Sequence, residues 1–371
     1  MSDDTAAEVG ALARELVRID SRSSLSNRPV AEAIEAHLPG FTFERIDYTD
    51  PAGVTKRCLV GRRGAGTGGL AFSGHMDTVP DTGWHDDPWS GRIAEGVLHG
   101  LGSADMKGPL AAVLFAARHL PARVPLTVAF TADEETTNQG ASEVAARSQL
   151  LREARPAGMI ITEPTRMVPV RGHRSYYLFR VGAAGVQAHS STGRGRNANW
   201  ALPEFLAEMR TLHEMLRTDP ALQDAAYDPP FTDLNPVIDN FGTADNVTVP
   251  RAEVRMSYRY SQRIDPAPVV AAVRAAAERH GLSFAEEHDG PPPELAVDHP
   301  LVARCVAATG TPAATAPFGT DAPELATLVP CVIMGPGDIG LAHAPGEHVP
   351  LAELARGAEV FARLACEMAE A

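Results

Sequence analysis

Residues 70–77 read Leu-Ala-Phe-Ser-Gly-His-Met-Asp, a short apolar run followed by two ionisable side chains. The apolar run predicts a buried β-strand over Leu70–Phe72. His75 and Asp77 stand two residues apart, so they share one face if the segment stays extended. Asp77 can then accept the second N–H of the His75 ring and fix its tautomer. The stretch therefore predicts a strand that ends in a functional histidine.

The same arrangement recurs along the chain, because acids or a histidine stand beside several other apolar runs. They are Asp105 before the helical pattern Leu110–Leu120, Glu134 and Glu135 after Leu126–Phe130, Glu163 after Met159–Ile161, and His343 beyond Cys331–Met334. Strands that alternate with helices, the last over Leu354–Met368, indicate a doubly wound α/β fold with a mainly parallel sheet. Ligands of such sheets bind beyond the carboxyl ends of the strands, so we expect these side chains to meet at one edge.

The middle of the chain breaks this alternation. Two segments alternate like half-exposed strands and two are patterned like amphipathic helices: Tyr176–Val181, Glu253–Tyr260, Trp200–Leu216 and Val269–His280. This predicts an inserted α+β domain over residues 174–289, with the Gly-Pro-Pro-Pro run that starts at Gly290 as the return linker. Residues 1–173 and 290–371 then form the catalytic domain.

Composition excludes several classes of partner. With 371 residues, of which 44% are hydrophobic, the chain can bury a full core. Its formal charge is −14, and no run of Lys or Arg is long enough to follow a phosphate backbone, so we expect no nucleic-acid partner. No stretch has the length of a membrane span or of a signal segment, and the four cysteines form no C-x-x-C pair. We therefore expect no membrane partner and a cytoplasmic location.

Two imidazoles with several carboxylates, and no cysteine placed to compete, form a ligand set that suits zinc. Charge counting favours a pair of ions, because three carboxylates, Asp105, Glu135 and Glu163, together with one hydroxide would neutralise two Zn²⁺. Adjacent side chains point in different directions, so Glu135 is interpreted as a ligand and Glu134 as the general base. Co²⁺ is a candidate substitute for zinc.

Each fragment also has a purely structural reading, since a lone histidine or a Glu-Glu pair usually lies on the surface or is satisfied in the core. The joint placement at strand ends favours the catalytic interpretation. A binding or scaffolding protein on the same fold is a further alternative, because a fold alone does not define a function. A binder would have no need of a base such as Glu134.

Three stretches resemble the signature segments of the M20 family of dinuclear zinc peptidases and deacylases: Ser73-Gly-His-Met-Asp-Thr-Val-Pro80, Gly100-Leu-Gly-Ser-Ala-Asp-Met-Lys-Gly108 and Thr131-Ala-Asp-Glu-Glu135. The resemblance extends over essentially the whole chain. It implies that Asp105 bridges two zinc ions, that His75 and Glu163 complete one site, and that Glu135 and His343 complete the other.

The resemblance also implies that the insert is the family's dimerisation and lid domain, so we expect a homodimer. The family's Gly-His-Ser-Ser motif is matched by Ala188-His189-Ser190-Ser191, with Ala188 in place of the usual Gly. His189 would then reach the partner subunit's active site and donate a hydrogen bond to the oxyanion. Asn246 and Arg259 match lid positions that contact substrate, although Met256-Ser-Tyr-Arg259 replaces a usual Met-Asp-Ile-Arg.

Within the family, three segments are similar to those of the acetylornithine deacetylases: Glu163–Arg171, Gly319–Pro323 and Gly335–His343. This likeness implies hydrolysis of a small N-acyl amino acid such as N-acetyl-ornithine, with Gly319 and Thr320 as further substrate contacts. A dipeptidase, a carboxypeptidase or a deacylase like succinyl-diaminopimelate desuccinylase would use the same metal centre. Only the shape of the substrate pocket separates these alternatives.

Overall fold

The computed structural model describes residues 3–369, which fall into two compact units. Unit 1 takes the residues up to Gly172, Pro293–Ala314 and the residues from Gly319 onward, and unit 2 consists of His173–Pro292 and Thr315–Phe318. The predicted catalytic domain includes Thr315–Phe318. In the structure this short segment belongs to unit 2, where the Thr315 hydroxyl donates a hydrogen bond to the backbone oxygen of Ala226.

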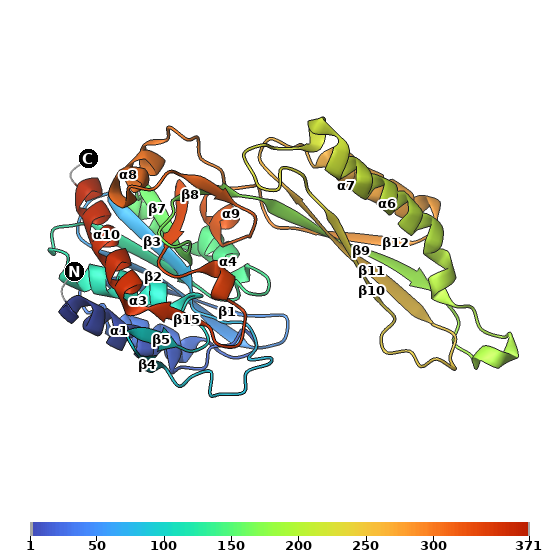
Figure 1. Ribbon diagram of the computed structural model, residues 1–371, viewed down its shortest axis with the longest axis horizontal. Coiled ribbons are helices and arrows are strands. Elements are labelled where there is room, and N and C mark those ends of the chain that lie inside the picture. Colours follow the sequence, from blue (N-terminus) through green and yellow to red (C-terminus); the bar gives the residue numbers. More distant parts are fainter. Residues whose placement is uncertain (1–2, 370–371) are drawn as a thin grey trace. The chain divides into compact units, whose positions relative to one another are not determined.

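A mixed eight-stranded sheet has the strand order β1-β2-β6-β3-β7-β14-β8-β13 and belongs to unit 1, apart from His173 at the end of β8 and the last two residues of β13 (Figure 1). The bounds of its strands are β1 Thr42–Thr49, β2 Thr55–Arg63, β3 Leu70–His75, β6 Leu126–Thr131, β7 Gly158–Pro164, β8 Val170–His173, β13 Ala314–Ala316 and β14 Cys331–Gly335. A small sheet with the order β15-β5-β4 consists of β4 Arg92–Ala94, β5 Val97–His99 and β15 His348–Pro350. The helices are α1 Asp3–Val17, α2 Arg28–Ala36, α3 Lys107–His119, α4 Gln139–Arg147, α5 Gln149–Ala154, α8 Pro300–Thr309, α9 Ala322–Leu325 and α10 Leu351–Ala369.

The centre of the large sheet is parallel and buried. β3 pairs in parallel with β6 and β7, and β14 pairs in parallel with β7. Every residue of β3, β6 and β7 is buried, as expected for strands that helices cover on both faces. α1, α3 and α10 pack against one another, and α3 contacts β3 and β7. The predicted fold class, a mainly parallel α/β sheet with a separate α+β unit, is confirmed.

Unit 2 is built from an antiparallel sheet with the order β10-β11-β9-β12 and two helices (Figure 1). Its elements are β9 Ser175–Ala184, α6 Pro203–Thr218, β10 Leu234–Asp239, β11 Arg251–Tyr260, α7 Ala267–Arg279 and β12 Ser283–His288. Alternate residues of β11 are buried and join residues of α6 and α7 in a second hydrophobic core. The helix predicted from Trp200 is wrong at its start. α6 begins at Pro203, a residue that suits the first helical turn, and Trp200 is 80% exposed.

All four cysteines are free thiols, and Cys58, Cys305 and Cys331 are buried, as small hydrophobic residues would be. Among the residues that the structure describes, no helix combines the length and the apolar character that a membrane span requires.

Candidate active site

Asp105 lies between two imidazoles. It stands in the loop before α3, and its side chain is 5% exposed. Its Oδ1 lies 3.1 Å from Nε2 of His75, at the end of β3, and its Oδ2 lies 3.2 Å from Nε2 of His343, in the loop between β14 and β15. Glu135, which follows β6, approaches the same His343 nitrogen at 2.9 Å. The structure thus brings these four predicted ligands into direct contact.

The donor set and its spacing suit zinc. His75, Asp105 and Glu135 each offer one ligand atom, and these atoms lie within 4.8 Å of one another. Adjacent ligands of a tetrahedral zinc ion, with bonds of about 2.0–2.1 Å, are separated by roughly 3.3 Å, which is close to the N–O distances around Asp105. A carboxylate whose two oxygens face two different imidazoles is also placed to bridge two ions. The residues therefore fit a zinc pair.

Negative charge is in excess at this site. Burial and the neighbouring carboxylates raise the pKa of Glu134 and of Glu163 well above the ordinary value. Hydrogen bonds to Asp105 and Glu135 raise the pKa of His343 to about 10. Burial alone would raise the pKa of Asp105, but hydrogen bonds from both histidines hold it below its usual range. A divalent cation bound among these groups would balance the same excess of negative charge.

Asp77 links the His75 strand to the turn that carries Glu134 and Glu135. Its Oδ1 accepts the N–H of Glu134 and its Oδ2 the N–H of Glu135, each at 3.3 Å, and the Ser23 hydroxyl donates to Oδ2 at 2.7 Å. Nδ1 of His75 lies 3.0 Å from the backbone oxygen of Asp77 and 3.6 Å from Oδ1. The predicted contact between His75 and Asp77 is therefore closest at the backbone carbonyl, and the carboxylate mainly holds the Glu134–Glu135 turn.

A buried ion pair supports the same turn from the preceding residue. Asp133 has a φ of 62°, a left-handed backbone conformation that Asp tolerates better than most residues. Nζ of the buried Lys56 lies 2.8 Å from its Oδ1, and the Tyr48 hydroxyl donates to its Oδ2 at 2.8 Å. These contacts fix Asp133 and with it the direction in which the chain leaves β6.

Glu163, Gly319 and Thr320 are the remaining predicted residues of unit 1. Glu163 lies in β7 and is 4% exposed. Burial lowers the pKa of His75, but the hydrogen bond with Asp105 and the charges of Glu163 and Asp105 raise it overall. Thr320 is fully buried beside the half-buried Gly319, and its hydroxyl accepts the N–H of Ala322 at the start of α9 at 3.0 Å.

The other predicted residues, His189, Asn246 and Arg259, belong to unit 2. His189 and Asn246 are neighbours, because the Ser190 N–H donates to the backbone oxygen of Asn246 at 2.9 Å. Nδ1 of the exposed His189 accepts the backbone N–H of Ser191 at 3.3 Å, so a neutral ring carries its proton on Nε2. Arg259 lies on β11 with its guanidinium carbon 5.6 Å from the centre of the Tyr176 ring.

Glu347 and Lys107 are two buried charged residues beside the predicted ligands, and neither was predicted from the sequence. Oε1 of Glu347 accepts the N–H groups of Ala104 and Asp105, and burial raises its pKa to about 7. Lys107 donates to the backbone oxygen of Ile19 at 2.6 Å, and burial lowers its pKa to about 8. Neither residue follows a predicted strand. The sequence feature that could have identified Glu347 is its position four residues after His343, in the same loop.

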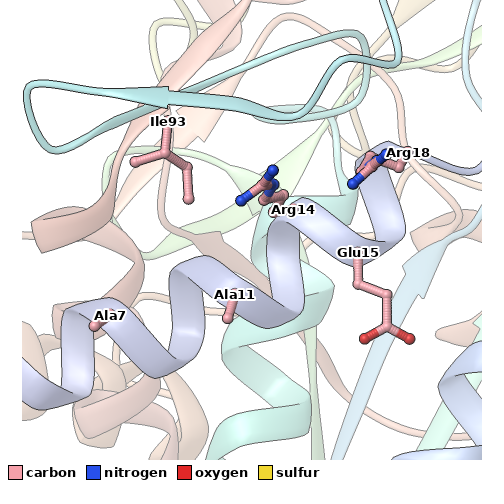
Figure 2. A pocket seen from close by; sticks show the side chains of 6 residues that line it. All are labelled: Ala7, Ala11, Arg14, Glu15, Arg18 and Ile93. Atoms are coloured by element: carbon pink, nitrogen blue, oxygen red, sulfur yellow. The ribbon is translucent and has the colours of Figure 1, made fainter.

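A pocket of unit 1 is formed by residues other than these. It has a volume of about 490 Å³ between α1 and β4, and Figure 2 shows the residues that line it: Ala7, Ala11, Arg14, Glu15, Arg18 and Ile93. The Glu15 carboxylate points away from Ile93 in this view. None of the predicted site residues lines this pocket, so it is not the site built around Asp105.

Comparisons with known proteins connect the chain to a family. The sequence profile described as Peptidase family M20/M25/M40 matches residues 71–367. The acetylornithine deacetylase of Myxococcus xanthus is 34% identical to this chain, and the alignment covers 97% of each protein.

Solved structures share the fold at low sequence identity. The M20 family metallo-carboxypeptidase Sso-CP2 from Sulfolobus solfataricus matches with a TM-score of 0.74 and 14% identity over 100% of both chains. The YXEP protein of Bacillus subtilis, described as a dinuclear metal binding peptidase, matches with a TM-score of 0.66 and 14% identity over 100% of this chain and 99% of that one.

Proposed function

Because this chain belongs to peptidase family M20/M25/M40, we propose that it is a two-zinc amidohydrolase that removes a small acyl group from the nitrogen of an amino acid. The Myxococcus xanthus relative is named acetylornithine deacetylase, so N-acetyl-ornithine is the proposed substrate. Removal of its acetyl group would place the enzyme in arginine biosynthesis, and we expect a cytoplasmic location.

The position of Asp105 carries the proposal of a metal pair. Each of its carboxylate oxygens faces one imidazole, at 3.1 and 3.2 Å. Asp105 is therefore the proposed bridge, with His75 and Glu163 on one ion and Glu135 and His343 on the other. The dinuclear description of the Bacillus subtilis protein supports the same metal count.

The chain's own residues supply the proton transfers. When bound, a zinc pair held by these residues would polarise the amide carbonyl and would lower the pKa of the attacking water. Glu134, whose backbone N–H is held by Asp77, accepts the proton of that water and then delivers it to the leaving nitrogen. Glu135 is engaged with His343 and is left out of this transfer. Asp77 acts by holding both glutamates in position.

We assign unit 2 to dimerisation and to closure over the substrate. β10 is an edge strand that exposes Val237 by 45% and Ile238 by 52%, and a groove of about 360 Å³ beside it is lined by residues of α6, β10 and β11. The opposite edge strand, β12, exposes the charged Glu286 and Glu287, a feature that discourages pairing. The β10 edge is thus the proposed surface for a second copy. The exposed Nε2–H of His189 would serve the partner's oxyanion, while Asn246 and Arg259 would contact substrate.

A substrate panel with metal analysis tests the proposal. Purified protein should contain two zinc ions per chain and should release acetate from N-acetyl-ornithine faster than it cleaves dipeptides or N-succinyl-diaminopimelate. A preference for dipeptides would assign the chain to the peptidases of its family. A preference for the succinylated substrate would replace acetyl by succinyl as the acyl group.

A further inference from the structure

Glu347 connects two segments that carry proposed metal ligands. It lies in the loop between His343 and β15, and it is 2% exposed. Its Oε1 accepts the N–H of Ala104 at 2.8 Å and the N–H of Asp105 at 3.0 Å, although Asp105 is 242 residues away in the sequence. One carboxylate oxygen therefore satisfies two consecutive backbone donors of the Asp105 loop.

The main chain of Glu347 reinforces the same connection. Its backbone oxygen accepts the N–H of Gly100 at 3.1 Å, and the next residue, His348, pairs with His99 in the small sheet. The Glu347 N–H donates to the backbone oxygen of Ala344 at 3.2 Å, which closes the turn directly after His343. The loop that carries His343 and the loop that carries Asp105 are thus joined at several adjacent points.

This connection matters because the two ligands meet through their side chains. Oδ2 of Asp105 lies 3.2 Å from Nε2 of His343, so a shift of either loop changes their separation. Burying a carboxylate costs desolvation free energy unless its oxygens accept hydrogen bonds. For Glu347, the N–H groups of Ala104 and Asp105 donate these bonds. Groups that orient ligands in this way commonly determine how tightly a metal site binds its ion.

We propose that Glu347 is a positioning residue that sets the geometry between Asp105 and His343 and thereby controls metal affinity. The proposal rests on the proposed zinc pair. The proposal requires that the Glu347 side chain be long enough to reach both N–H groups and carry one acceptor oxygen. Two substitutions separate the effect of side-chain length from that of charge. Glu347→Gln keeps the length and an acceptor oxygen but loses the charge, whereas Glu347→Asp keeps the charge but is one methylene too short to reach both donors.

The experiment measures zinc affinity by competition with a chelating indicator, together with amide hydrogen exchange of residues 103–107 in the metal-free protein. Glu347→Gln should stay close to wild type in both measurements. Glu347→Asp and Glu347→Ala should lose about 10- to 100-fold in zinc affinity, and their amides at Ala104 and Asp105 should exchange faster. Glu294→Gln serves as the control, because Glu294 is a buried carboxylate of unit 1 paired with Arg171.

Two results with these variants would overturn the proposal. Wild-type zinc affinity and wild-type exchange in Glu347→Asp would overturn it. A Glu347→Gln protein that folds but binds zinc as weakly as Glu347→Asp would also overturn it, because charge rather than reach would then be the requirement. The exchange measurement needs no metal or substrate. If the wild-type protein bound no zinc, the proposed function would fail, while the exchange data would still report whether Glu347 holds the loop.

Discussion

Glu134 and Glu135 are adjacent in the sequence but have different surroundings. Asp77 holds the N–H groups of both, yet the Glu135 carboxylate is engaged by His343. Burial raises the pKa of both carboxyl groups above the ordinary value, so the contact of Glu135 with His343 is what separates the two residues. This difference supports the assignment of one glutamate as ligand and the other as base.

Replacing Glu134 should separate catalysis from metal binding. Glu134→Ala should retain two zinc ions and lose at least roughly 100-fold in kcat, the lower end of the effect of a general acid–base group. Metal analysis and steady-state kinetics on N-acetyl-ornithine provide the test, with Glu143→Ala on α4 as the control. Turnover close to that of the control would remove Glu134 from its proposed role.

The bridging assignment of Asp105 predicts a distinctive pattern of metal loss. Asp105→Ala should weaken both ions together, whereas Glu163→Ala and His343→Ala should each weaken mainly one, because only Asp105 is proposed to contact both. Zinc content after dialysis against a graded series of chelator concentrations distinguishes the variants. Two tightly held ions in Asp105→Ala would show that another residue is the bridge.

The sequence was sufficient to nominate residues that follow apolar strands, and it could not reveal those placed by tertiary contacts. His75, Glu135 and His343 are found from their places after strands, and the structure brings them together around Asp105. Glu347 and Lys56 stand in no such pattern. Their partners are backbone N–H groups and a buried carboxylate that are distant in the sequence, so only the folded structure identifies them.

At the scale of elements, burial explains which strands could be predicted. β3, β6 and β7 are buried throughout, so their apolar runs are visible in the sequence. β10 and β12 are edge strands whose residues are mostly exposed, and β12 carries the sequence Ser-Phe-Ala-Glu-Glu-His. Their backbone pairing holds them in the sheet, and such pairing leaves little trace in a hydrophobic pattern.

The junction of β8 and β9 contains a histidine whose burial makes stability depend on pH. Burial lowers the pKa of His173 to about 4, below the ordinary value of 6.5. Between these two pH values the unfolded chain binds more protons at this residue than the folded one, so stability falls as the pH falls through this window. The loss from this residue is up to about 3 kcal/mol.

Substituting His173 should remove this contribution. Urea unfolding of metal-free His173→Gln protein should depend less steeply on pH between pH 4 and 6.5 than that of wild type, whatever the offset in absolute stability. His85→Gln, which changes an exposed histidine, is the control and should keep the wild-type slope. Equal slopes for His173→Gln and wild type would show that this residue does not carry the predicted linkage.

In the proposed mechanism, each active site uses residues of two chains. The proposed metal ligands and Glu134 belong to unit 1, while His189 belongs to unit 2, whose β10 edge is the proposed dimer surface. His189→Ala should therefore lose activity without losing zinc. This loss alone does not show which chain His189 serves.

Mixing two inactive variants identifies the chain that His189 serves. Heterodimers of His189→Ala and Glu134→Ala contain one site with an intact Glu134 and an intact His189 from the partner. With random pairing, about half of the dimers are mixed and each regains one of two sites, so activity should recover to roughly a quarter of wild type. No recovery, with subunit exchange demonstrated by mass-tagged chains, would mean that His189 does not act on the partner's site.

Titrating metal-free protein with zinc tests whether a zinc pair serves deacylation. Hydrolysis of N-acetyl-ornithine is measured at each step alongside the amount of bound zinc. Activity should be absent without metal, should rise as zinc binds to the site around Asp105, and should stop rising at two ions per chain. Full activity in the metal-free protein, or two bound ions without any release of acetate, would rule out a zinc pair that serves deacylation.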